Sequence, residues 1–387
     1  MNDPPGEFGG EFGDESGGQL IDEVAAATLA CLPDMTFGRM RMLVDHFGSV
    51  QRTLAGVRAG HVTSLSLHPE PDTDAVRSLR RAAASWSDKA DPDAVATRIQ
   101  RRGTHVWVEG SARYPITDAI PDRPVVLLAE GDRPDALASP RVGIVGTRAA
   151  SPHGLADARE LGAFLAEAGV TVVSGMAIGI DAAAHDGALA AGGLAVGVVA
   201  TGLDIEYPRR HRLLYERVRR AGVVLGETGF GVQPLTWRFP VRNRIIAALS
   251  EVVVVVEATA RGGARITAQF ALDYGRAVLA VPGSRRNPAA EGTNALIADG
   301  AHPLVDWSDV LVAIGLSEGR GRVARAPARP TPSPDGAAIV RALGGECATP
   351  DQIGSRTGLA PELVAVALFE LERTGWVDRA QGAIWPR

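Results

Sequence analysis

The chain has 387 residues, 45% of them hydrophobic, which suffices for two or three domains with a sizeable core. No apolar run approaches the ~20 residues that span a bilayer, and the start lacks the basic and apolar regions of a signal peptide. The two cysteines, Cys31 and Cys347, lie far apart without metal-ligand spacing. We therefore expect a cytoplasmic protein with no membrane partner, no bound metal and no cofactor.

The net charge of −5 argues weakly against a nucleic-acid partner until its distribution is considered. Residues 1–23 carry seven acidic residues and no Lys or Arg, so without these seven the formal charge is +2. Residues 1–18 are mainly Gly, Pro and acids, and we predict that they form a disordered acidic tail.

Residues 19–102 have the pattern of a helical domain. Apolar residues recur at helical spacing in 20–32, 37–48, 74–86 and 91–103. Asp91 is a suitable N-cap for the last of these helices, because Pro92 follows it at the first helical position.

Strands and helices then alternate through residues 103–317. Apolar runs predict strands at 105–109, 125–131, 141–146, 170–174, 194–200, 222–227, 251–258 and 276–283. The predicted helices begin near Pro152, Ile180, His211, Arg242, Arg265 and Asn294. Continuous apolar strands that alternate with helices indicate an α/β fold, an extended Rossmann-like doubly wound sheet. Ligands of such sheets bind outside the carboxyl ends of the strands.

The remaining chain divides into a linker and a small domain. Residues 318–335 are rich in Pro and Arg, which predicts an extended linker. Residues 336–387 contain a helix, a helix-turn-helix pattern over 349–375 and a short hairpin, and this order predicts a winged helix.

Two glycine-containing turns, in 141–154 and 172–185, each connect a predicted strand to a helix. Such turns direct backbone N–H groups at one place, where an anion can bind. Glycine keeps the backbone accessible, while the hydroxyl and guanidinium groups can donate to phosphate. The residues that we predict to bind there are Gly146, Thr147, Arg148, Ser174, Gly175 and Gly179.

Asp181 and His185 follow the second turn at helical i, i+4 spacing. One interpretation pairs them as acid and base, or as part of a metal site. We favour a structural role, in which Asp181 holds the loop through backbone N–H groups, because the sequence offers no third ligand or nucleophile.

Three later segments add basic residues at the same predicted edge. The segment after the fifth Rossmann-like strand carries Arg209, and a third glycine turn carries Gly263 and Arg265. Arg242, Asn243 and Arg244 stand where an apolar helix is predicted to begin. Because a helix dipole disfavours cations at that end, we predict a bound phosphate there. The alternative is a buried Arg paired with Asp or Glu.

Several of these blocks occur together in one order: GTR…S, SGMAIGIDAAAH, GLDIEYPRRH, FPVRNRIIAALS, a Gly-Gly turn and GTNALIADGA. In this respect the chain resembles the DNA-processing protein A (DprA/Smf) family. The resemblance covers roughly residues 104–314 closely, and the terminal domains fit the family's order more loosely. It implies a helix-hairpin-helix-like or SAM-like domain at 19–102 and a DNA-binding Rossmann-like domain.

The resemblance also implies a function. Members of the family bind single-stranded DNA without known catalysis, protect incoming strands during natural transformation and help to load RecA. They act as homodimers through the Rossmann-like domain. The family's DNA pocket lies at the glycine turns, which implies roles for Arg148, Ser174, Gly175 and Arg242, and then for Arg244 and Arg265.

An enzyme of the phosphoribohydrolase type is the alternative, because such enzymes share a glycine cradle. They need a glutamate near it, and Glu257 and Glu227 are the candidates. We discount a dinucleotide-dependent oxidoreductase, because the first turn lacks G-x-G-x-x-G and the next strand ends at Ser174 instead of an acid.

Overall fold

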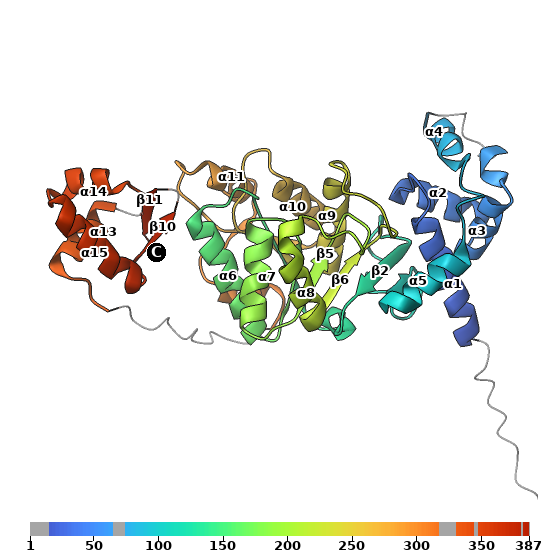
Figure 1. Cartoon of the computed structure of the whole chain (residues 1–387), viewed down its shortest axis with the longest axis horizontal. Helices are drawn as coiled ribbons and strands as arrows, with labels where there is room; N and C mark the ends of the chain where they lie inside the picture. Colours follow the sequence, from blue (N-terminus) through green and yellow to red (C-terminus); the bar gives the residue numbers. More distant parts are fainter. Residues whose placement is uncertain (1–14, 65–73, 317–329, 344–346, 381, 387) are drawn as a thin grey trace, which may run out of the picture.

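The computed structural model describes residues 15–64, 74–316, 330–343, 347–380 and 382–386, and the chain is elongated (Figure 1). At one end lie the helices α1 (Glu15–Ala30), α2 (Phe37–Phe47), α3 (Val50–Arg58), α4 (Asp74–Ala83) and α5 (Pro92–Arg102). Asp91 caps α5 as predicted, by accepting a hydrogen bond from the N–H of Ala94.

The structure differs from the sequence analysis at two places in this region. The first helix begins at Glu15, so the predicted end of the acidic tail at residue 18 lies inside α1; residues 1–14 lie outside the described residues. Extending an existing helix by one turn costs little compared with starting one, so apolar periodicity marks its beginning poorly. Helix α3 was not predicted, although Ser49 caps it and its apolar face is buried.

The strands of the central domain form one nine-stranded sheet in the order β1-β2-β6-β5-β4-β3-β7-β8-β9. Their bounds are β1 (His105–Val108), β2 (Val126–Glu130), β3 (Arg141–Val145), β4 (Thr171–Gly175), β5 (Ala195–Val198), β6 (Gly222–Gly226), β7 (Val252–Val255), β8 (Ala277–Ala280) and β9 (His302–Pro303). The seven neighbouring strands β6, β5, β4, β3, β7, β8 and β9 pair in parallel. Strands β1 and β2 add an antiparallel edge beside β6. The predicted doubly wound α/β class is confirmed.

Helices cover both faces of this sheet. On one face lie α6 (Pro152–Glu167), α7 (Ile180–Ala190) and α8 (Arg212–Ala221), with α12 (Ser308–Ala313) near the far edge. On the other lie α9 (Arg238–Leu249), α10 (Gly263–Asp273) and α11 (Glu291–Ala298). Strands buried on both faces explain the continuous apolar runs, such as Val252–Val255 with four buried valines.

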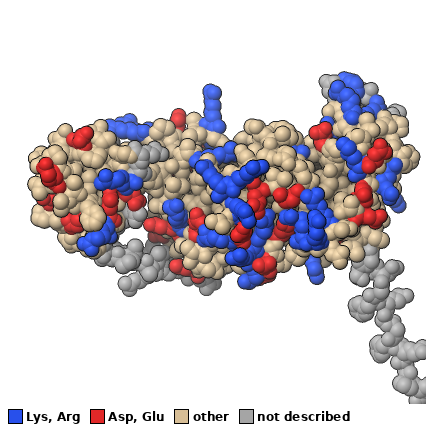
Figure 2. Space-filling model, in the orientation of Figure 1, with Lys and Arg blue, Asp and Glu red and all other residues tan. Residues whose placement is uncertain are grey.

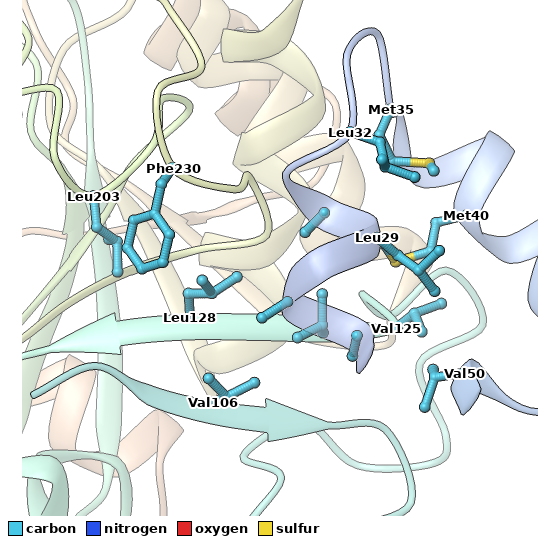
Figure 3. Close-up of a cluster of buried hydrophobic side chains, with 14 of the residues drawn as sticks. Leu29, Leu32, Met35, Met40, Val50, Val106, Val125, Leu128, Leu203 and Phe230 are labelled. Carbon is cyan, nitrogen blue, oxygen red and sulfur yellow. The ribbon is translucent and has the colours of Figure 1, made fainter. Parts of the chain in front are cut away.

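The N-terminal helices share a core with the sheet (Figure 3). Leu29 and Leu32 of the first helix region belong to the same buried cluster as Val106 of β1 and Leu128 of β2, and Phe230 joins it from the loop after β6. Helix α1 therefore covers the antiparallel edge of the sheet, and the sequence boundary near residue 102 does not separate two cores.

The opposite end of the chain has the helices and the hairpin of the predicted winged helix (Figure 1). It comprises α13 (Pro334–Leu343), α14 (Pro350–Thr357), α15 (Pro361–Arg373) and the hairpin of β10 (Val377–Ala380) and β11 (Ala383–Pro386), around a core of its own. Most of the predicted linker 318–335, namely residues 318–329, lies outside the described residues. Among the described ranges, no helix has the length and apolar character needed to cross a bilayer.

Candidate functional site

The order of the strands reverses at β3 and β7. From β3 the chain proceeds through β4 and β5 to β6, and then returns to place β7 on the other side of β3. A crevice forms at such a point, because the loops that leave the two strands diverge. Here a pocket of about 430 Å³ lies between Gly146–Arg148, which follow β3, and Gly262–Gly263, which begin α10.

A second pocket of about 400 Å³ adjoins the first. The two share a wall, and we call the combined depression the groove; the shared residues are Arg148, Ala177, Tyr207, Phe239 and Arg242. Arg148 lies over the Phe239 ring, with its guanidinium carbon 5.1 Å from the ring centroid. Tyr207 packs on the same ring at 5.5 Å between centroids. The wall therefore combines cations with aromatic faces.

Arg242 is buried at the base of this wall. Its guanidinium donates to the backbone oxygen of Val198 at the end of β5. Burial lowers the pKa of Arg242, and the carboxylate of Asp181 opposes that effect. Burial likewise raises the pKa of Asp181, against the opposing charge of Arg242. A Cβ on Gly175 would overlap both side chains, so this glycine lets the buried pair reach the end of β4.

The second glycine turn closes tightly on the first. Gly179 precedes α7 with φ +87°, a conformation that favours glycine. A Cβ there would strike the backbone of Thr147 and Arg148. Ile180 N–H donates to the Thr147 oxygen at 3.3 Å, which joins the two turns. The first six predicted residues therefore lie in one region, although not all of their side chains face the groove.

Asn243 and Gly263 were both predicted to bind, and both line the first pocket. The Asn243 amide donates to the Gly263 oxygen at 3.2 Å, so it ties α9 to the start of α10. The amino end of α10 thereby faces the pocket beside Arg242, an arrangement that attracts anions.

Ser174 and Arg265, which were also predicted to bind, have side chains directed elsewhere. The Ser174 hydroxyl is fully buried and donates to the Ile144 oxygen at 2.5 Å. Arg265 pairs with Asp299 at 3.6 Å and donates to the Ala260 oxygen at 2.9 Å. Neither side chain belongs to the lining of the groove.

Arg244 follows the alternative interpretation, the buried ion pair. It is buried with Glu227 as its partner, donates to the Asp122 oxygen at 2.6 Å, and its guanidinium carbon lies 4.0 Å from the Phe37 ring centroid. The helix also begins at Arg238, one turn before the predicted start, so neither arginine stands at its N-terminus. Residues two apart on a helix point in different directions, and this separates Arg242 from Arg244.

Arg209 lines a neighbouring depression beside Asp204 and Glu206, whereas the adjacent Arg210 lines the groove. Both belong to a short 3₁₀ turn, Arg209–His211, and no sequence signal distinguishes their directions. Figure 2 shows basic side chains gathered over the middle of the visible face, where Figure 1 labels α7 and α8, and acidic side chains lie between them.

The residues of the alternative chemistries are buried or held by hydrogen bonds and ion pairs. His185 is completely buried, which lowers its pKa to about 4 and keeps the ring neutral, and no group of three metal-ligating side chains occurs in the described ranges. Glu257 accepts hydrogen bonds from the Ser151 N–H at 2.8 Å and from the Ser151 hydroxyl at 2.6 Å. Glu227 is held by Arg244.

Comparison with known proteins identifies the family to which the chain belongs. The family described as DNA recombination-mediator protein A matches residues 105–315, and the DprA winged helix domain matches residues 323–383. The chain belongs to the DNA recombination-mediator protein A family. The resemblance drawn from the motifs is therefore confirmed.

Relatives of this family extend over most of the chain. Protein Smf of Escherichia coli is 37% identical over 272 residues, which cover 68% of this chain and 72% of the relative. The putative DNA processing protein DprA of Mycobacterium tuberculosis is 40% identical over 266 residues, which cover 67% of this chain and 68% of the relative. The crystal structure of Streptococcus pneumoniae DprA matches with a TM-score of 0.62 and 31% identity, over 76% of this chain and 97% of that one.

Proposed function

We propose that the groove binds single-stranded DNA and does not cleave it. The observation that carries this proposal is the shared wall, on which Arg148 and Arg242 stand beside the rings of Tyr207 and Phe239. Single-strand binders combine cations for the phosphates with aromatic faces on which bases stack. The amino end of α10 adds backbone N–H groups at the same edge.

Membership of the family supports a role in DNA processing, since its relatives are named DNA processing proteins. We infer that the chain protects incoming single strands in the cytoplasm and helps to load RecA onto them, during natural transformation or recombination. We further infer that it acts as a homodimer through its Rossmann-like domain.

A salt titration of oligonucleotide binding tests the groove. Arg148→Ala removes a phosphate contact, so we expect weaker binding and a slope of log K against log salt that is smaller by about 0.7. Phe239→Leu removes a stacking surface, so we expect a loss of about 1–3 kcal/mol without a change of slope. The measurement is fluorescence anisotropy with a labelled single strand over a range of salt concentrations.

Arg101→Ala is the matched control, because Arg101 is an exposed arginine on α5 that lines neither pocket of the groove. This variant should bind like the parent. If Arg148→Ala and Phe239→Leu also bind like the parent, the groove is not the DNA site. Equal affinity of the parent for single and double strands would transfer the proposal to the winged helix.

A further inference from the structure

The outward face of α15 carries an exposed apolar stripe. Leu363, Val366 and Phe369 are 47%, 69% and 69% exposed, and they recur at three-residue spacing along one side of the helix. The opposite side of α15 supplies the core of the winged helix through Val364, Leu368 and Leu371. The exposed residues are therefore not required for the domain's own packing, and such contiguous patches mark interaction sites.

This stripe does not suit a nucleic acid. Helix α15 occupies the position of the recognition helix, yet acids at 362, 370 and 372 accompany a single basic residue, Arg373. Phosphates favour basic residues, and apolar side chains of this size need another apolar surface. The chemistry of α15 therefore favours a protein partner.

The ends of the stripe indicate which protein. Glu362, Val366, Phe369 and Arg373 are spaced by four, three and four residues, so they follow one line on the helix, and both charged ends are exposed. A second α15 in antiparallel orientation would place Glu362 against Arg373 and Val366 against Phe369. A two-fold axis through the middle of the helix pair would repeat each contact on its other side. Ala365, small and exposed beside this line, would allow close approach.

We propose that α15 docks on α15 of a second copy of this chain, antiparallel and two-fold symmetric. The contact is isologous, so each favourable pair occurs twice. Opposed helix dipoles add to the attraction. Because one helix stripe buries less area than a standard interface, the contact is weak by itself and adds to any association through the central domain.

Sedimentation velocity of the full chain across a wide concentration range tests the contact. We expect a reversible step of association that Val366→Glu/Phe369→Glu weakens by about a hundredfold, because two charges replace apolar contacts on each side of the axis. Circular dichroism of this variant checks that the winged helix remains folded. An unchanged association step in the folded variant would overturn the proposal.

A charge exchange distinguishes self-pairing from another partner. Glu362→Arg alone places like charges together twice, so we expect about tenfold weaker association. Glu362→Arg/Arg373→Glu restores opposite charges, and we expect it to restore association to near the parent's level. Failure of the double exchange to restore it contradicts the antiparallel self-pairing. Neither result depends on DNA binding by the groove.

Discussion

At the scale of single residues, Arg242 and Arg244 show how neighbours in one motif acquire different tasks. Both are buried, but Arg242 lines the groove beside Asp181. Arg244 instead forms an ion pair with Glu227 and a cation–π contact with the ring of Phe37. The sequence predicted a phosphate site at these two arginines, and it left the buried ion pair open as an alternative. Only the direction of each side chain decides between the two roles, and direction depends on where the helix begins.

The carboxyl group of Asp157 on α6 permits a test of how much its ionisation destabilises the folded chain. Its pKa is raised to about 6, first by burial and then by the nearby carboxylates of Glu160 and Glu257. The folded chain thus binds this proton more tightly than the unfolded chain does, so ionised Asp157 destabilises the fold. The cost is absent below about pH 4 and complete above about pH 6.

Asp157→Asn should therefore raise the free energy of unfolding by about 1–2 kcal/mol near pH 8 and leave it nearly unchanged near pH 4. Denaturant unfolding at the two pH values measures the difference. An equal gain at both values would indicate that packing, and not ionisation, is responsible.

At the scale of elements, the two glycine turns work as one unit. The start of α7 is pressed against the backbone that follows β3, with Gly179 at the point of contact. The sequence predicted both turns from apolar strands followed by glycines. It could not predict that they touch, because their contact depends on the parallel pairing of β3 with β4.

Gly179→Ala tests this contact. The added Cβ meets the backbone of Thr147 and Arg148 and also strains a residue at φ +87°. We expect a loss of stability of about 1–3 kcal/mol together with weaker DNA binding, since the Arg148 loop must move. Unfolding and anisotropy measurements on the same preparation report both effects.

Gly192→Ala is the matched control. Gly192 also has a positive φ, +75°, but a Cβ there meets open space. This variant should show the backbone strain without the loss of DNA binding. Equal binding losses in the two variants would mean that stability, and not the position of the loop, governs affinity.

At the scale of the whole molecule, the two ends of the chain differ in their dependence on the sheet. The N-terminal helices share a buried cluster with β1 and β2, as Figure 3 shows for Leu29 and Leu128. The winged helix has a separate core around Leu368 and Leu371. The predicted boundary near residue 102 therefore lies within one shared core, whereas the predicted linker separates two cores.

Truncation should reveal this difference. A chain that lacks residues 1–102 exposes the apolar face of β1 and β2, so we expect it to aggregate or to unfold at much lower denaturant concentration. A chain that ends at residue 316 keeps its sheet covered and should retain the unfolding midpoint of the central domain. Size-exclusion chromatography and denaturant unfolding compare the two, and a stable, monodisperse product of the first truncation would contradict the shared core.

The sequence by itself determined the family, the doubly wound class and the edge of the sheet where the groove lies. These properties follow from local signals, since apolar runs bounded by glycines record strands buried on both faces and the loops that leave them. From the sequence, Arg148, Asn243 and Gly263 were predicted to lie at one edge of the sheet, because the carboxyl ends of parallel strands lie at the same edge. All three line the first pocket of the groove.

Tertiary structure alone decided which side chains face that place. Ser174 donates a hydrogen bond to Ile144, whereas Arg265 and Arg244 form ion pairs with Asp299 and Glu227, and each of these partners is distant in the sequence. It also decided that the first helix completes the core of the sheet and that the apolar stripe of α15 is left uncovered. Burial and direction are properties of packed neighbours, and a periodic pattern does not identify those neighbours.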